Sequence, residues 1–407
     1  MTRRLLHTAL VLGLITAVGP FAIDMYLPSM PSMGRTLHAS PAAVQMSLTA
    51  FFVTLGICQL IYGPLSDIVG RKTPIYGGLV IFVLGSIGCA LAPDIHVLIG
   101  FRVLQAFGAC AGMVIPRAIV RDLHTGHEAT RLMSLLMLVV SISPILAPLT
   151  GSLVIGAFGW RGVFVVLTLA AVIAFVLTLT QLKETRPPEH RAHSTWRNAF
   201  SAYRTLLADP AFTGLSFVGA FGISAFFVFI ASASFVLINH YGLSPTQFSY
   251  CFALNAASFF GCSQITAKLT ARFGLPRVIR VAVAGFAAVM TLLAVLMICG
   301  ATSLGLMIVL LFIGYGFLGL VLPSTAVLAL ESHGAVAGAA SALMGSIQMV
   351  TGAVVMAIAG LYADGAPQPM VIGIAGCAIA AFLVTQLALR RREADWSAHR
   401  AGARGDF

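Results

Sequence analysis

The sequence predicts an all-α membrane protein with twelve transmembrane helices arranged as two pseudo-symmetric six-helix bundles. Three observations lead to this fold class. Of the 407 residues, 59% are hydrophobic and only 9% are charged, with a mean hydropathy of +0.97, which lies outside the composition of soluble proteins. Apolar windows of about 18 to 25 residues, each long enough to cross a hydrocarbon layer, recur from end to end. One long polar stretch divides them into two sets of six.

The expected spans follow these windows in chain order. They are 5–27, 43–65, 74–93, 96–120, 132–157, 161–182, 212–238, 245–267, 277–299, 302–328, 335–361 and 368–389. The first window follows Arg3 and Arg4, as the apolar region of a signal peptide would, but it is too long and lacks a small-residue cleavage site. It is therefore expected to remain in the membrane.

The basic residues predict the orientation. Of 24 Lys and Arg, 20 fall on the side of the twelve-span arrangement that carries both termini. Because cytoplasmic loops are rich in Lys and Arg, both termini are expected in the cytoplasm of a bacterial cell, with the chain multi-pass in the inner (cell) membrane. The net charge of +11 then reflects a surface attracted to anionic membrane lipid, and no nucleic-acid partner is expected.

The polar stretch predicts the domain organisation. We expect an N-terminal bundle over 1–182, a cytoplasmic linker over 183–211, a C-terminal bundle over 212–390 and a cytoplasmic tail over 391–407. A weak internal repeat supports two similar halves, because "GPLSDIVGRKTP" after the second span returns as "AKLTARFGLPR" after the eighth, with Gly70 matching Gly274. Two such halves are the plan of a secondary transporter, here expected to be a monomer.

Enzyme chemistry and metal binding have little support. Twelve of the 13 acids lie in or beside loops, and no His-rich, DDxxD-like or GxSxG cluster occurs. The seven cysteines fall within spans, where they serve as small packing residues. His190 and His193 form an HxxH without neighbouring acids or thiols. We expect no enzyme activity, no metal and no cofactor.

Asp24, in "PFAIDMYLPSM", is the acid that lies clearly inside a span. A charge at mid-bilayer costs about 2.5 to 3.5 kcal/mol, so an acid there indicates function. Arg102 in the fourth span is expected at a comparable depth. If the two helices adjoin across a water-filled cavity, changes in burial or in the Asp24–Arg102 distance would bind or release a proton. The alternative is a static pair that holds two helices together.

Two further segments indicate moving parts. In "GPLSDIVGRKTPIYGG", Gly63 and Gly70 favour a tight turn, Asp67 is expected to face a helix N-terminus, and Arg71 is expected to meet Asp122 as part of a gate. The general excess of basic residues in cytoplasmic loops would explain the two basic residues of this segment, but not its ordered Gly, Asp and Gly.

In "SISPILAPLTG", three residues are expected to bend or hinge the fifth span, namely Pro144, Pro148 and Gly151. Other residues are candidates for a substrate cavity because they adapt to varied apolar shapes or offer polar contacts. The amide groups serve equally well as hydrogen bonds between helices, and the aromatic and methionine side chains more often serve plain packing. These candidates are Met25, Tyr26, Gln105, Arg117, Phe226, Phe227, Asn255 and Gln348.

Together these motifs resemble the major facilitator superfamily over essentially the whole chain, and within it the drug:proton antiporters of the bicyclomycin-resistance (Bcr/CflA) type. "GPLSDIVGRK" resembles the loop signature after the second span, "RVLQAFGACAGMVIPRAIVRD" the fourth-span motif, and "SPILAPLTG" the antiporter motif, with Ala147 where that motif commonly has Gly. The resemblance implies two bundles that rock around a central cavity, Asp24 and Arg102 as the proton-coupling and substrate-sensing pair, and small, mostly apolar antibiotics such as phenicols or bicyclomycin as cargo.

The leading hypothesis is proton-driven efflux of small drug-like molecules. The alternative with the same fold is a proton-coupled transporter of a natural metabolite, such as an amino acid, nucleoside or sugar derivative, although few polar groups lie mid-span for a hydroxylated sugar. A membrane sensor or scaffold is a third possibility, but the linker and tail are too short for a signalling domain.

Overall fold

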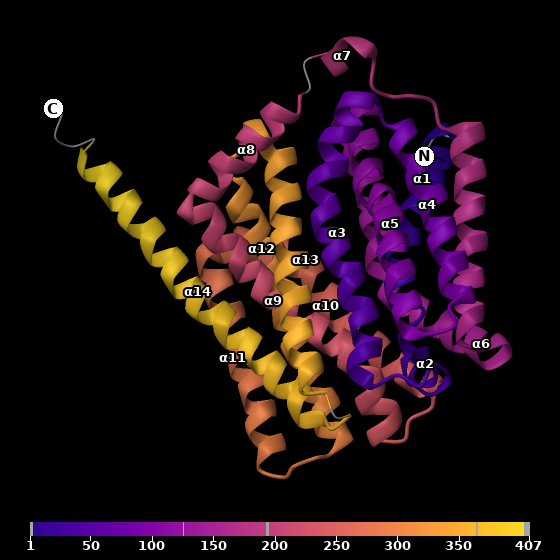
Figure 1. Ribbon diagram of the computed structural model, residues 1–407. Coiled ribbons are helices and arrows are strands. Elements are labelled where there is room, and N and C mark those ends of the chain that lie inside the picture. The colour runs from indigo at the N-terminus through magenta and orange to yellow at the C-terminus, as the bar shows by residue number, and fades with distance from the viewer. Residues whose placement is uncertain (1–2, 125, 193–194, 364, 403–407) are drawn as a thin grey trace.

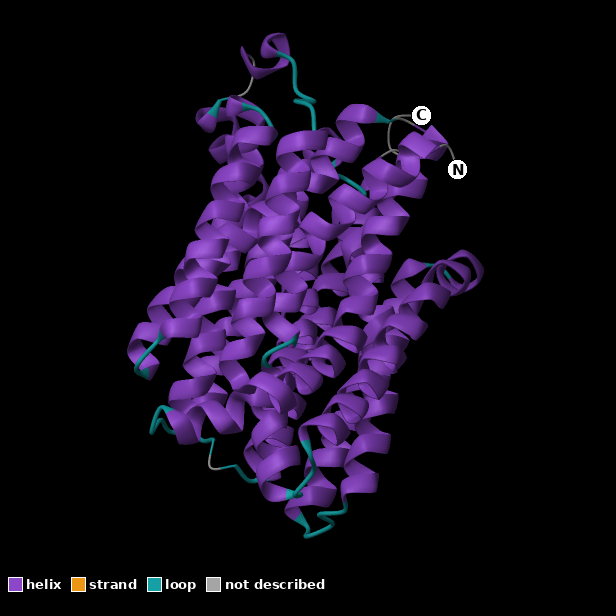
Figure 2. Ribbon diagram, turned by 90° about the vertical axis from the view of Figure 1, so that its right-hand side faces the viewer, coloured by secondary structure: helices purple, strands orange, loops and turns teal. Residues whose placement is uncertain are grey.

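The computed structural model describes residues 3–124, 126–192, 195–363 and 365–402. Within these ranges the chain is helical almost throughout and contains no strand (Figure 2). The elements in chain order are α1 (Arg3–Asp24), η1 (Leu27–Ser29), α2 (Met30–Thr36), α3 (Pro41–Val69), α4 (Lys72–Leu91), α5 (Ile95–Leu123), α6 (Gly126–Gln181), α7 (Pro188–Ala192), α8 (Trp196–Ala208), α9 (Pro210–Ser234), η2 (Phe235–His240), α10 (Pro245–Phe273), α11 (Leu275–Ile298), α12 (Leu304–Leu330), η3 (Gly334–Val336), α13 (Ala337–Leu361) and α14 (Pro367–Gly402).

Helices occupy all twelve predicted spans. Ten described helices are long and apolar enough to cross a membrane. One of them, α6, has 56 residues and holds the fifth and sixth spans, which are separated at Gly159, where the backbone φ is 68°. α10 has the 29-residue length of α3 but a more polar composition, with Asn255, Gln264 and Lys268 along it. The protein is therefore an all-α, multi-pass membrane protein.

The helices form two groups that meet along two pairs of helices. α1 and α3 to α6 pack with one another, and α9 to α14 pack with one another. Between the groups, α3 packs on α13 and α6 packs on α10 (Figure 1). α7 and α8 cross between the groups on the side where both chain ends lie, which we call the linker face (Figure 1). α2 lies at the opposite end, which we call the far face.

The first helix ends earlier than its predicted boundary at residue 27. α1 stops at Asp24, because Pro28 has no N–H to donate to the carbonyl of residue 24, four positions earlier. The chain then makes a short turn through η1 and continues in α2, where Pro31 again lies near the helix start. The two prolines therefore break the helix beside Asp24, and helical structure resumes beyond them.

Serine and glycine set the ends of α3 and α10. Each helix starts with Pro after a Ser whose hydroxyl accepts from a backbone N–H of the first turn, Ser40 for α3 and Ser244 for α10. Each ends at a glycine with positive φ, 99° at Gly70 and 80° at Gly274. Because L side chains rarely adopt this conformation, the pairing of Gly70 with Gly274 seen in the sequence repeat has a backbone cause.

Candidate functional site

Arg102 lies at the centre of the first helix group and is fully buried. Its Nη1 donates to the carbonyl of Ala22 at 3.0 Å and to Oε1 of Gln105 at 2.5 Å. The guanidinium also lies over the rings of Tyr26 and Phe51, 4.5 and 4.2 Å from their centroids. Its Nε and Nη2 have no hydrogen-bond partner among the described residues. A buried cation with free donors is available to a further acceptor.

Asp24 is the last residue of α1 and is 4% exposed. In the described part of the chain no ion pair joins it to Arg102. The arginine instead binds the carbonyl of Ala22, two residues before the acid, and stacks on Tyr26, two residues after it. The two predicted groups are thus neighbours along the same segment without a direct contact in this conformation. A buried carboxyl group without a paired cation is sensitive to any change in its access to water or charge.

The predicted hinge in α6 contacts the segment that follows Asp24. Gly151 packs so closely on this segment that a Cβ there would collide with the carbonyl oxygen of Met25. One turn earlier, the carbonyl of Pro148 accepts a hydrogen bond of 2.8 Å from Oγ of Ser249, which belongs to α10 in the other group. The hinge segment therefore touches both the turn after Asp24 and the opposite half of the protein.

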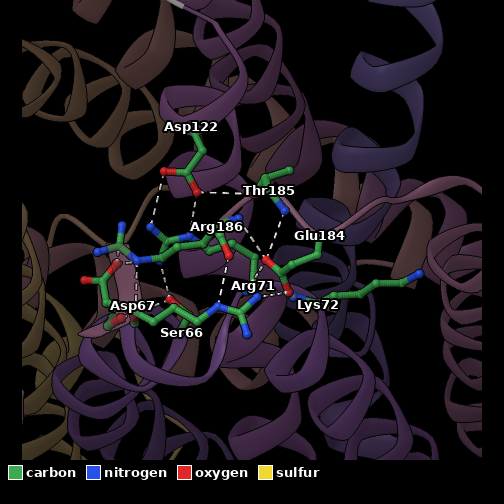
Figure 3. A network of polar contacts seen from close by, with 10 residues as sticks. Ser66, Asp67, Arg71, Lys72, Asp122, Glu184, Thr185 and Arg186 are labelled. Carbon is green, nitrogen blue, oxygen red and sulfur yellow. Dashed lines mark hydrogen bonds and ion pairs between the residues drawn. The ribbon is translucent and has the colours of Figure 1, made fainter. Parts of the chain in front are cut away.

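Arg71 is the centre of an ion cluster at the linker face (Figure 3). Its Nε lies 2.8 Å from Oδ2 of Asp122, so the predicted contact between these two side chains is present. Its Nη1 lies 2.7 Å from both Oδ1 of Asp67 and Oγ of Ser66. Burial favours the neutral form, but the hydrogen bonds and charges of Asp122 and Asp67 outweigh it and raise the pKa of Arg71. The cluster holds the ends of α3, α4 and α5 together.

Glu184, at the start of the linker, caps α4 and was not singled out from the sequence. Its Oε1 accepts from the backbone N–H of Arg71 at 2.9 Å and its Oε2 from that of Lys72 at 3.2 Å; Oε1 also accepts from Thr185 and Arg186 (Figure 3). Partial burial acts to raise the pKa of Glu184, but these backbone donors prevail and lower it. The sequence signal is an acid placed directly after the sixth span, opposite a helix start that lacks an acceptor of its own.

The expectation that Asp67 faces a helix N-terminus is therefore wrong for α4, because Glu184 occupies that place. Asp67 instead contacts cations, Arg71 and, at 3.5 Å, Arg186 of the linker. Gly70 permits the arrangement, since a Cβ there would lie 2.6 Å from Oε2 of Glu184. A Cβ at Gly63, in contrast, would meet no atom within 4 Å, because this glycine lines a cavity.

Two cavities lie between the helix groups. The first, of about 560 Å³, is bordered by α3 and α5 on one side and by α8 and the start of α13 on the other. The second, of about 860 Å³, lies between the first part of α6 and α10. Met133 lines both, so they adjoin.

The structure places the predicted cavity residues in two settings. Arg117 lines the first cavity. The others lie outside both cavities, and all but the half-buried Gln348 are buried: Tyr26 and Gln105 against Arg102, Met25 under Gly151, Phe226 stacked on Phe259, Phe227 stacked on Phe52, Asn255 bonded to the Cys251 carbonyl, and Gln348 beside Gly219. In this conformation the aromatic candidates pack helices together.

Metal ligands do not gather anywhere in the described ranges, where no group of three or more His, Cys, Asp or Glu side chains could hold an ion. The side chains of His190 and His193, which form the HxxH of the linker, lie outside the described residues. Residues 403–407 of the predicted tail also lie outside them, whereas α14 extends to Gly402.

Comparison with known proteins agrees with this architecture. The family model of the Major Facilitator Superfamily matches residues 12–356. An uncharacterized MFS-type transporter, YdgK of Bacillus subtilis, is 38% identical over 359 residues, 88% of this chain and 89% of that protein. A bicyclomycin resistance protein homolog of Haemophilus influenzae is 28% identical over 377 residues, 92% of this chain and 94% of that protein.

Among solved structures, an inward-facing, occupied bacterial homolog of the human lysosomal transporter Spinster superposes with a TM-score of 0.72 at 18% identity, over 95% of this chain and 96% of that one. This likeness concerns the fold alone. The matched family, the bicyclomycin resistance protein homolog and the Multidrug resistance protein D of Escherichia coli, 32% identical over 64% of this chain and 65% of that protein, make the chain a transporter rather than an enzyme. The chain belongs to the Major Facilitator Superfamily and, within it, to the bicyclomycin-resistance (Bcr/CflA) type of transporter.

Proposed function

We propose that the protein exports small drug-like molecules across the bacterial inner membrane in exchange for protons, by alternating access of one chain. The observation that carries the proposal is the position of Asp24. This buried acid is the last residue of α1 and lies between two residues that Arg102 contacts. The carbonyl of the next residue, Met25, packs closely against Gly151 of the α6 hinge. A relative named for bicyclomycin resistance supports the cargo class.

The excess of Lys and Arg supports a cytoplasmic linker face with both termini on that side. The first cavity would then receive cargo from the cytoplasm. At the far face, η1 packs on α9 and α10, and α2 packs on η2, so the two halves are in contact there. We therefore take this conformation as inward-facing.

Proton coupling would work through Asp24 and Arg102. When the halves rock, the α6 hinge shifts against the turn after Asp24, which changes the distance of the acid from Arg102 and from water. A carboxyl group responds to both changes by gaining or losing a proton. Exchange of a neutral drug for one proton moves one charge inward, and each charge contributes about 2.3 kcal/mol per 100 mV of membrane potential.

The ion cluster around Arg71 would serve as the cytoplasmic gate. Asp67 and Gly63 line the first cavity opposite Gly338 and Ser341 of α13. Closure on this side would bring α13 onto the cluster, whose salt bridges keep the ends of α3, α4 and α5 in one geometry.

The test is Asp24→Asn compared with wild type and with Asp24→Glu, which keeps a titratable acid. Each is expressed in a drug-sensitive host without its own pumps, scored against a panel that includes chloramphenicol and bicyclomycin, with and without an uncoupler. We expect wild type to protect only without uncoupler and Asp24→Asn to give no protection at equal expression. Normal protection by Asp24→Asn excludes Asp24 as the coupling acid. Absence of protection by wild type against every compound favours a natural metabolite as cargo.

A further inference from the structure

We propose that Arg117 and Arg121 form an anion-binding site in the first cavity, and that amphipathic organic anions are a cargo class of this transporter. The inference rests on the proposed function, because it names the chemistry of the exported molecule. It starts from two arginines that line a cavity without a counter-ion.

Arg117 and Arg121 lie one turn apart on α5, so their side chains project from the same face of the helix. Both line the cavity of about 560 Å³ and are exposed to it. Within the described ranges neither makes a hydrogen bond or an ion pair. Asp122, the next residue on α5, points elsewhere and binds Arg71. The helix thus turns its acid toward the gate and its two cations toward the cavity.

The other walls of the cavity do not neutralise these charges. Asp67 is the acid among the residues that line it, and its Oδ1 already lies 2.7 Å from Nη1 of Arg71. The facing residues from α3, α8 and α13 include uncharged hydrogen-bonding groups, namely Gln59, Asn198 and Ser341. Two like charges one helical turn apart repel each other. An oxyanion placed between them would relieve this repulsion and accept charge-assisted hydrogen bonds from both guanidinium groups.

A role in membrane orientation alone does not explain the placement. Orientation requires basic residues in cytoplasmic loops, and Arg131 in the first turns of α6 meets that need without lining either cavity. Arg117, in contrast, lies six residues before the end of α5 and faces the space between the two helix groups.

The adjoining cavity supplies an apolar environment for the rest of the molecule. It shares Met133 with the first cavity and is lined by Met137, Ile142, Ile145 and Phe260. Flexible Met and aromatic side chains accommodate varied apolar shapes. With about 860 Å³ it has the size of a site for a drug-sized molecule. The pair of cavities therefore fits a cargo with one anionic group and an apolar body.

The experiment compares two fluorescent probes with the same ring system, anilinonaphthalene sulfonate, which is anionic, and N-phenylnaphthylamine, which is neutral. Binding to the purified full chain is measured in phosphatidylcholine nanodiscs. The variants are Arg117→Gln, Arg121→Gln and Arg117→Lys, with Arg131→Gln as the control for surface charge. Loss of one charged partner is expected to weaken sulfonate binding about tenfold or more in each Gln variant. Arg117→Lys should retain most of the affinity, and the neutral probe should bind all variants alike.

Equal weakening of both probes by Arg117→Gln, or an equal effect of Arg131→Gln on the sulfonate, overturns the proposal. A second series of discs contains phosphatidylglycerol. If this lipid abolishes the difference between wild type and Arg117→Gln, the site belongs to a lipid headgroup and the assignment to cargo is wrong. Binding is measured without a proton gradient, so failure of proton coupling at Asp24 would leave these results unchanged and the two proposals fail separately.

Discussion

At the scale of single residues, the two buried arginines Arg71 and Arg102 differ in how many of their nitrogen atoms have a hydrogen-bond or ion-pair partner. Arg71 is satisfied by two carboxylates and a hydroxyl, and its backbone N–H is bound by Glu184. Arg102, equally buried, retains two free nitrogen atoms, Nε and Nη2. A saturated cation stabilises one geometry, whereas an unsaturated one is available to a new partner. This difference matches the roles proposed for them, a gate for Arg71 and a coupling site for Arg102.

The first prediction concerns Glu184→Gln. The amide retains the shape of the cap but removes the negative charge from the α4 N-terminus, so the free energy of unfolding should fall by about 1 kcal/mol, since the carboxylate is partly exposed and screened. Because the pKa of Glu184 is lowered in the folded protein, its contribution is present above the unfolded-state pKa and is lost as pH falls through the folded pKa. Thermal unfolding in detergent from neutral to acidic pH measures both effects.

The matched control is Glu189→Gln, on α7 and outside the ion cluster. We expect its unfolding curve to follow wild type. If the gap between Glu184→Gln and wild type stays constant as the solution is acidified, the cap does not act through its charge.

At the scale of elements, α6 is in contact with both moving parts of the proposed mechanism. Gly151 touches the turn after Asp24, and Pro148 accepts a hydrogen bond from α10. A carbonyl oxygen has two lone pairs, so the carbonyl of Pro148 can accept from Ser249 of the opposite half in addition to a bond within the helix. A shift of α6 would therefore move both the turn after Asp24 and the interface between the two halves.

Gly151→Ala tests the first contact. Its Cβ would collide with the Met25 carbonyl, so α1 and α6 must separate, and we expect a loss of about 1 to 3 kcal/mol in stability together with reduced efflux. Gly156→Ala, on the same helix with no atom within 4 Å of the added Cβ, should leave efflux unchanged and be slightly stabilising. Equal behaviour of the two variants in unfolding and drug-resistance assays would mean that the close approach of α6 to α1 has no role.

Ser249→Ala tests the second contact. Removing one hydrogen bond between the halves should disfavour this conformation by about 1 kcal/mol, which reduces its population relative to the other by about fivefold. Ser263→Ala removes a hydroxyl that bonds within α10 and should not shift the populations. Distances between spin labels across the linker face measure the change. An unaltered distance distribution in Ser249→Ala would show that the bond does not favour one conformation.

At the scale of the whole molecule, the two halves have matching helices but different charged residues at the helix ends. α3 and α10 have equal length, the same Ser-Pro start and the same glycine end, yet the ion cluster of Asp67, Arg71 and Asp122 occurs at the end of α3 alone in the described part of the chain. In the degraded repeat at the end of α10, Ala271 and Leu275 stand where the acid and the arginine would be. In the proposed mechanism, the matching helices allow the two halves to rock, and the ion cluster fixes the helix ends in the half that contains it.

The sequence by itself determined where the helices lie and where several of them end. Hydropathy located all twelve spans, and the glycines at 70 and 274 located two boundaries, because these properties depend on the local chain and its solvent. The contact between Arg71 and Asp122 was also predictable, since opposite charges stood at helix ends on one side of the membrane.

Only the tertiary structure decided which polar groups meet. It placed Glu184 at the N-terminus of α4 and joined Ser249 to Pro148. It put the Ala22 carbonyl and the Tyr26 ring against Arg102, in place of a salt bridge to Asp24. It also directed the side chains of Arg117 and Arg121 toward a cavity. These partners are tens to more than one hundred positions apart in the chain, and hydropathy carries no information about the rotation of one helix against another. Side-chain packing sets that rotation, because close approach is possible only where small residues such as Gly151 allow it.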